Sequence, residues 1–257
     1  KSEITKNLLF SILIGISLAY IREQFDNVFH DDNELELILK PFNVPLLASF
    51  PFFKKISSEN DKNDKNDKND KTNEFIISES FRNFATSLRF LNINNQETNI
   101  FLVTSTKQSE GKTTLTSLLA KTLSDLGQKI LIIDGDMRRP ALHKFFKIDN
   151  IIGLSNLITD SKLNFKNVVK KTSFNNLDII PAGIKPPDPV YLLSSERLKL
   201  IINELKNESY DIILFDAPPS LGLSDAQLIS DYSDLVLYIV NMADTNKTQF
   251  KKTIYKF

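Results

Sequence analysis

Three consecutive residues, Gly111, Lys112 and Thr113, form the part of this sequence best suited to bind phosphate. They follow an apolar or β-branched run at residues 100–104 and a polar loop, and the amphipathic run LTSLLAKTLSDL comes after them. This order predicts a strand, a phosphate-binding loop and a helix, because backbone N–H groups of such a loop cradle phosphate oxygens. Lys112 would then reach the β- and γ-phosphates of a nucleotide, and the Thr113 hydroxyl would ligate Mg²⁺.

The pattern is imperfect, because Thr106 stands where a phosphate-binding loop usually has its first glycine. An ordinary strand-to-helix turn that carries a basic residue is the alternative interpretation. If the loop does bind a nucleotide, we predict the following contacting residues: Ser109, Glu110, Gly111, Lys112, Thr113, Thr114 and Arg138.

Two further apolar runs, ILII and IILF, end in aspartates. The first is followed by Asp134, Asp136 and Arg138, and the second by Asp216. A nucleotide-bound Mg²⁺ takes oxygen ligands and keeps several waters, so we predict Asp216 in its water shell, with Thr113 and Asp134 as further metal ligands. Asp134 is also a candidate base toward an incoming hydroxyl, and Asp136 would hold the metal or orient Arg138. Strand termination or helix N-capping is the alternative role for these aspartates.

The surrounding elements predict how these residues are brought together. Further buried strands are expected at residues 130–133, 177–180, 212–215 and 235–240. Phe81, Phe84, Leu88 and Leu91 have the spacing of a helix, and a second helix from Lys112 can end at Gly127. Strands that alternate with helices predict an α/β fold with a mostly parallel sheet covered on both faces, and ligands of such sheets bind at the carboxyl ends of the strands.

The N-terminal quarter of the 257 residues has a different character. Residues 7–21 carry no charge, and we predict a transmembrane helix within residues 1–24, with a signal peptide or a buried core helix as alternatives. Residues 25–58 are predicted as a juxtamembrane connector with a short helix at 34–39 and an extended segment at 44–51. Residues 59–73 contain Asp-Lys-Asn triplets and predict a disordered linker, so the globular domain would span residues 74–257.

Composition excludes several classes of function. Lys plus Arg and Asp plus Glu both number 32, and this balance gives no reason to expect a nucleic-acid partner. The chain contains no cysteine, which excludes disulfides and thiolate metal sites. His30 and His143 are too far apart in sequence for a convincing histidine metal site.

The motifs together resemble the bacterial tyrosine kinases, the P-loop kinases of polysaccharide co-polymerases. TSTKQSEGKT resembles their Walker A loop, ILIIDGDMR their Walker A′ motif, and IILFDAPP their Walker B motif. ESFRN resembles the start of the preceding helix, and PAGIKPPDPVYLLSS resembles a proline-rich loop of the family. The apolar N-terminal run and the segment VPLLASFP resemble the family's second transmembrane helix and its linker.

The resemblance implies a P-loop NTPase-like fold and an ATP- and Mg²⁺-dependent protein tyrosine kinase that regulates exopolysaccharide or capsule synthesis and export. It implies catalytic roles for Lys112, Asp134, Asp136 and Asp216. The expected partners are polysaccharide polymerisation and export proteins, protein tyrosine substrates, the membrane and further copies of the chain. The expected location is the bacterial plasma membrane, with the kinase domain in the cytoplasm.

Several residues depart from the family pattern. Glu79 and Arg82 match the family's Glu-x-x-Arg-x-x-Arg interface motif, but Ala85 replaces the second arginine. Gln108 and Ser109 replace the usual Pro-Gly, and a serine at a position with positive φ would be strained. The family's last strand and tyrosine-rich tail would lie beyond Phe257.

Two other functions remain open at this point. Lys107 lies four residues before Gly111, where partitioning-type ATPases carry a signature lysine, so a non-kinase ATPase switch is one alternative. The other is a catalytically weakened scaffold of the export machinery, which Ser109 and Ala85 would explain.

Overall fold

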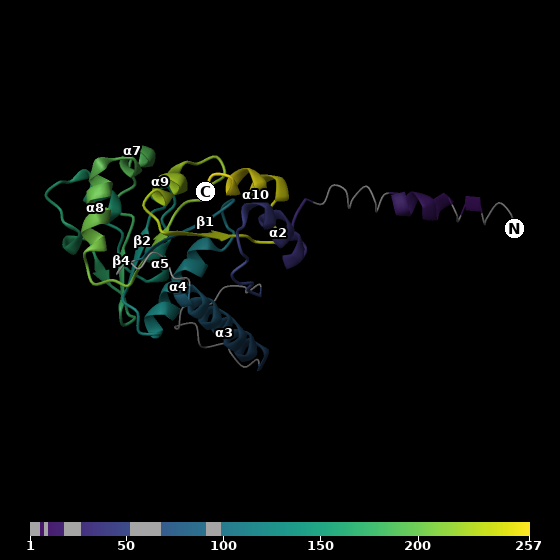
Figure 1. Ribbon diagram of the computed structural model, residues 1–257, viewed down its shortest axis with the longest axis horizontal. Helices are drawn as coiled ribbons and strands as arrows, with labels where there is room; N and C mark the ends of the chain where they lie inside the picture. The colour runs from purple at the N-terminus through teal and green to yellow at the C-terminus, as the bar shows by residue number, and fades with distance from the viewer. Residues whose placement is uncertain (1–5, 8–9, 18–26, 52–67, 91–98) are drawn as a thin grey trace.

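The computed structural model describes residues 6–7, 10–17, 27–51, 68–90 and 99–257 (Figure 1). At the N-terminal end, residues 6–7 and 10–17 are helical, and the side chains of Phe10, Leu13 and Ile16 are exposed. The transmembrane helix predicted within residues 1–24 lies partly outside the described residues. Among the helices of the described ranges, none combines the length and the apolar character that crossing a membrane requires.

A six-stranded sheet with the order β3-β4-β2-β5-β1-β6 forms the centre of the domain. Five of its strands are mutually parallel, and β3 alone pairs antiparallel, with β4. The strands are β1 (Asn99–Ser105), β2 (Ile130–Asp134), β3 (Lys170–Lys171), β4 (Leu177–Ile180), β5 (Ile212–Asp216) and β6 (Leu235–Ile239). The five predicted strands are thus confirmed. The two-residue β3 was missed because two lysines carry no strand pattern.

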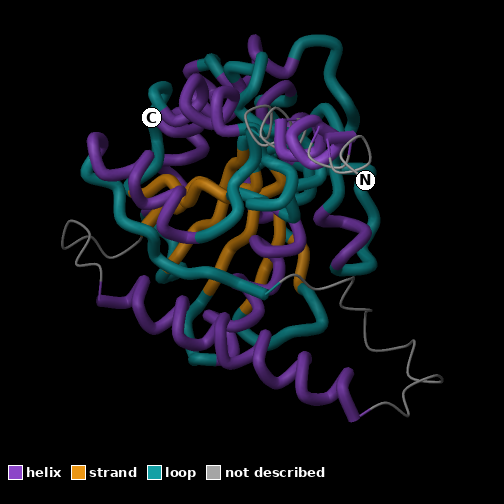
Figure 2. The backbone as a smooth tube through the Cα atoms, turned by 90° about the vertical axis from the view of Figure 1, so that its right-hand side faces the viewer, coloured by secondary structure: helices purple, strands orange, loops and turns teal. Residues whose placement is uncertain are grey.

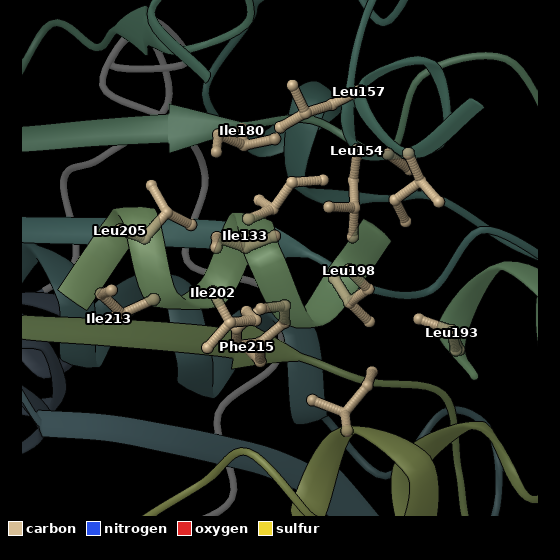
Figure 3. Close-up of a cluster of buried hydrophobic side chains, with 14 of the residues drawn as sticks. Ile133, Leu154, Leu157, Ile180, Leu193, Leu198, Ile202, Leu205, Ile213 and Phe215 are labelled. Atoms are coloured by element: carbon tan, nitrogen blue, oxygen red, sulfur yellow. The ribbon is translucent and has the colours of Figure 1, made fainter. Parts of the chain in front are cut away.

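Side chains on the strands alternate between two apolar cores, as expected for a sheet covered on both faces. On one face, Ile133, Ile213 and Phe215 pack against Leu198 and Ile202 of α8 (Figure 3). Four helices cover this face: α6 (Leu154–Thr159), α7 (Pro189–Leu193), α8 (Glu196–Lys206) and α9 (Asp225–Ser230). The loop before β3 includes a short 3₁₀ helix, η3 (Phe165–Asn167).

The opposite face is covered by α3 (Lys68–Phe90), α4 (Lys112–Asp125) and α5 (Leu142–Phe145), and Figure 2 shows the strands between the two helical layers. In α3, the predicted Phe81, Phe84 and Leu88 are all buried, which confirms the helical spacing; Leu91 lies outside the described residues. The helix begins at Lys68, so the end of the predicted linker is helical. That tract has no proline or glycine to stop the helix from extending toward its N-terminus.

A third apolar cluster joins the N-terminal segment to the C-terminal helix. It packs α2 (Asp32–Leu39) against α10 (Lys247–Ile254), with the rings of Phe29 and Phe250 edge to face at 5.5 Å. Lys247 forms an ion pair with Glu34 at 2.9 Å. The predicted short helix is therefore confirmed, and a 3₁₀ turn, η1 (Lys40–Phe42), follows it. Residues 44–51 contain no helix or strand, as predicted, and Phe50 packs against α3.

Candidate active site

The predicted phosphate-binding residues and aspartates meet at the carboxyl edge of the sheet. Strands β2, β5 and β1 are neighbours, and their register places Asp216 beside both Asp134 and Val103. Helix α4 begins at Lys112, directly after β1 and its loop. The Lys112 Nζ lies 2.5 Å from Asp216 Oδ1, and the Thr113 hydroxyl donates to Asp216 Oδ2 at 2.7 Å. The predicted convergence of Lys112, Thr113 and Asp216 is therefore present.

Asp134 is buried completely beside this group. Its carboxylate accepts backbone N–H groups from Asp136, Ala141 and Leu142 at 3.1–3.2 Å. Burial, and secondly the nearby charge of Asp216, raise the pKa of Asp134 to about 8, although Lys112 opposes the shift. In the nucleotide-free protein Asp134 therefore holds a proton more tightly than an ordinary aspartate does, and its ionised form is the stronger base.

Asp136 and Arg138 follow Asp134 but take part in different contacts. Asp136 is buried, and this burial raises the pKa of its carboxyl group. The Asp136 carboxylate accepts a hydrogen bond from the Arg139 N–H at 2.9 Å. The Arg138 guanidinium donates to both carboxylate oxygens of Asp225 at 3.0–3.3 Å. Asp225 was not predicted, because nothing in its local sequence distinguishes it from an ordinary first residue of a helix. Arg138 is therefore paired with Asp225 of α9, and the contact of Arg138 with nucleotide stays a prediction.

Replacing Asp225 by asparagine should destabilise the fold, because the Asp225 side chain is only 1% exposed and its charge compensates the guanidinium of Arg138. We expect a loss of about 2 kcal/mol and a fall in melting temperature of about 5 °C, measured by thermal unfolding. The exposed Asp231 at the end of α9 provides the matched control, Asp231→Asn, which should leave the melting temperature within about 1 °C. Equal melting temperatures for both variants would contradict the role of the pair.

The phosphate-binding loop contains two residues with positive φ, Ser109 at 67° and Gly111 at 86°. The predicted strained serine is therefore confirmed. Glu110, predicted to contact nucleotide, instead turns its carboxylate toward the Thr245 hydroxyl and the Lys107 N–H. Burial of this carboxyl raises the pKa of Glu110. The Glu110 side chain is thus engaged within the protein, and its nucleotide contact stays a prediction.

Replacing Ser109 by glycine should stabilise the protein, because glycine adopts a left-handed conformation without the penalty that a side chain brings. The side chain is exposed, so its removal costs little packing. We expect a gain of about 0.5–1 kcal/mol in the free energy of unfolding, measured with urea. Ser87→Gly, an exposed position inside α3, should instead lose about 0.5–1 kcal/mol. A loss of stability in Ser109→Gly would show that the loop does not hold this strain.

The donor set suits the magnesium of a nucleotide rather than a metal held by the protein alone. Among the described residues there is no group of three or more His, Asp or Glu side chains arranged to bind a metal ion. Nucleotide-bound Mg²⁺ needs only one or two carboxylates together with phosphate oxygens and waters. Asp216, already within hydrogen-bond distance of Thr113 and Lys112, meets that requirement at the base of the loop.

Comparisons with known proteins agree with this geometry. A family model described as an AAA domain matches residues 98–256. Over 176 residues the chain is 39% identical to "Putative tyrosine-protein kinase CapB" of Staphylococcus aureus, covering 68% of this chain and 76% of that protein. It is 32% identical to tyrosine-protein kinase YwqD of Bacillus subtilis over 175 residues, with coverages of 68% and 73%.

A solved structure shows the same fold. The kinase domain of the Escherichia coli tyrosine kinase Etk superimposes with a TM-score of 0.70 at 26% identity, covering 85% of this chain and 86% of that one. Three observations support the same assignment: the sequence similarity, the shared P-loop α/β fold, and the motif residues gathered at one edge of the sheet. The chain belongs to the family of bacterial tyrosine-protein kinases.

Proposed function

We propose that this chain transfers the γ-phosphate of ATP to protein tyrosine at the site formed by Lys112, Thr113, Asp134 and Asp216. The observation that supports the proposal best is the direct contact of Lys112 and Thr113 with Asp216, with Asp134 as the neighbouring residue on β2. These residues come from three segments more than 20 positions apart, and each occupies the place its motif requires.

Each side chain has a defined task in this mechanism. The Lys112 ammonium and the N–H groups at the start of α4 would neutralise and orient the transferred phosphate. Thr113 and Asp216 would hold Mg²⁺, with Asp134 as a further ligand, and the ion would neutralise charge on the phosphates when it is bound with ATP. Asp136 would support the position of the metal and the substrate.

Asp134 would accept the proton of the substrate tyrosine. A tyrosine hydroxyl has a pKa near 10, and an ordinary aspartate is too weak a base to take its proton efficiently. Because burial raises the pKa of Asp134 to about 8, the ionised side chain is a much stronger base. The cost of keeping that charge buried is partly offset by three backbone N–H groups and by Lys112 nearby.

The alternative of a partitioning-type ATPase switch depends on Lys107, and the structure gives this residue a partner in its own chain. Lys107 Nζ lies 2.8 Å from Asp244 Oδ1, in the loop that follows β6. The Lys107 side chain is therefore paired within its own chain. The similarity to tyrosine kinases also favours the kinase function over this alternative.

The cellular setting is part of the proposal. We infer from the apolar N-terminal run a plasma-membrane protein whose kinase domain lies in the cytoplasm and regulates polysaccharide synthesis and export. Self-association would involve Arg82, which is exposed, and Glu79, which is partly exposed; the Arg82 Nε and Glu79 Oε1 atoms lie 3.9 Å apart on α3. Ala85 is fully buried, so a second interface arginine at that position would place its charge in the core.

The experiment that tests the proposal is incubation of the purified chain with Mg²⁺ and ATP, followed by detection of phosphotyrosine on the chain and on an added tyrosine copolymer. We expect phosphotyrosine that depends on both ATP and Mg²⁺. ATP hydrolysis with nucleotide-dependent dimerisation and no phosphotyrosine would support the ATPase switch instead. Absence of nucleotide binding would support the scaffold.

A further inference from the structure

The phosphate-binding loop is tied to a loop that lies far from it in the sequence. Glu110 of the phosphate-binding loop is 5% exposed, and Thr245, between β6 and α10, is fully buried. The Thr245 hydroxyl donates to Glu110 Oε1, while the other carboxylate oxygen accepts the Lys107 N–H at 2.9 Å. The Thr245 oxygen also accepts the N–H of Asn241 at 3.1 Å, so the hydroxyl is held in place from both sides.

A second contact connects the same two loops closer to solvent. Lys107 Nζ pairs with Asp244 Oδ1 at 2.8 Å, where the side chains are 33% and 53% exposed. Solvent screens such a pair, so its contribution to the loop's position is smaller than that of the buried Glu110–Thr245 contact. Together the two contacts join the consecutive residues Asp244 and Thr245 to Lys107 and Glu110, which are the two ends of a four-residue stretch of the phosphate-binding loop.

This loop needs external support because it lacks the residues that usually shape it. Thr106 and Ser109 occupy positions where related loops have glycine, Gln108 replaces a proline, and Ser109 adopts a φ of 67°. A strained backbone persists only where its surroundings determine it strongly. The Glu110 carboxylate holds the loop in this conformation, because it accepts one hydrogen bond from the main-chain N–H of Lys107 and another from the Thr245 hydroxyl outside the loop.

We propose that Glu110 and Thr245 form a latch that holds the phosphate-binding loop in its nucleotide-binding conformation, which makes Thr245 a positioning residue for ATP. The inference rests on the proposed binding of ATP by this loop. Thr245 acts through Glu110 and does not itself contact the phosphates. Removing its hydroxyl therefore weakens nucleotide binding by loosening the loop, and leaves the groups that carry out phosphoryl transfer unchanged.

The test measures the affinity of the whole chain for a fluorescent ATP analogue in the presence of Mg²⁺, with KM and kcat for ATP. Thr245→Val removes the hydroxyl at nearly constant shape, and we expect the dissociation constant and KM to rise about tenfold while kcat changes less than twofold. Thr245→Ser, which keeps the hydroxyl, should restore the affinity to within about threefold. The control Thr172→Val removes a hydroxyl that is hydrogen-bonded to Leu177 near β3, at the other edge of the sheet, and should leave affinity unchanged.

The latch also predicts coupling between its two residues. If they act through one contact, Glu110→Gln combined with Thr245→Val should weaken binding by clearly less than the product of the single effects. Folded Thr245→Val protein with wild-type affinity would overturn the latch, whereas failure of the wild-type chain to bind the analogue would overturn the proposed function itself. If Thr245→Val does not fold, Thr245→Ala, which also removes the hydroxyl, replaces it with the same expected rise in the dissociation constant; unchanged affinity of folded Thr245→Ala would equally overturn the proposal.

Discussion

Replacing Lys112 by methionine is expected to lower the rate of phosphotyrosine formation at least about 100-fold. The ammonium group lies 2.5 Å from Asp216 and is buried at the start of α4, where the phosphates of a nucleotide would meet the helix N-terminus. Methionine keeps the length and most of the packing of the side chain but removes its charge. The loss of a charge that stabilises the transferring phosphoryl group should therefore appear in the rate, measured with labelled ATP and a tyrosine copolymer.

The same substitution leaves Asp216 without its ammonium partner, so the fold must be checked alongside the activity. Asp216 keeps its hydrogen bond from Thr113, and we expect a folded protein whose melting temperature is clearly lower, because a buried carboxylate loses its cation. Lys129→Met, an exposed lysine just before β2, is the matched control and should keep wild-type activity and stability. A folded Lys112→Met variant with half or more of the wild-type rate would contradict the proposed role of Lys112.

Replacing Asp134 by asparagine is expected to reduce phosphotransfer about 100-fold or more and, at the same time, to stabilise the nucleotide-free protein above neutral pH. The rate falls because asparagine cannot accept the tyrosine proton. The stability rises because asparagine carries no charge to bury, whereas Asp134 is fully buried beside Asp216.

The pH dependence of this stabilisation follows from the direction of the pKa shift. The pKa of Asp134 is about 8 in the folded protein, against an ordinary value of 3.8, so the folded state holds the proton more tightly. The stability that this proton provides is complete below about pH 4 and is lost as the pH rises through 8. The advantage of Asp134→Asn should therefore grow between pH 5 and 8, by at most about 1.4 kcal/mol per pH unit, and then level off.

Urea unfolding of both proteins at pH 5, 6, 7, 8 and 9, without nucleotide, measures this difference. Gln227→Ala, a neutral change at an exposed position of α9, is the control, and its free energy of unfolding should vary with pH in the same way as that of the wild type. A difference between Asp134→Asn and the wild type that is constant with pH would show that Asp134 is not protonated in the folded protein. Retained activity in Asp134→Asn would exclude it as the base.

The sequence alone determined five of the six described strands, the loop before α4 and the convergence of Lys112, Thr113 and Asp216. Apolar runs such as residues 130–133 and 212–215 indicate buried strands, because strands of a parallel sheet are covered on both faces and carry apolar residues at consecutive positions. Lys112, Asp134 and Asp216 could be placed together because carboxyl ends of parallel strands meet at one edge. The strain at Ser109 was also predictable, because it follows from the local backbone that the loop requires.

Only the tertiary structure decided which side chains face the site and which support it. The Glu110 carboxylate accepts a hydrogen bond from Thr245, a residue 135 positions away, and nothing in the local sequence indicated this partner. Arg138 pairs with Asp225 on another helix. Hydrophobic periodicity reveals which face of an element is buried, but it carries no information about which distant polar group will satisfy a buried charge. That choice is made when the layers pack, because a buried carboxylate or guanidinium must find its partner there or remain costly.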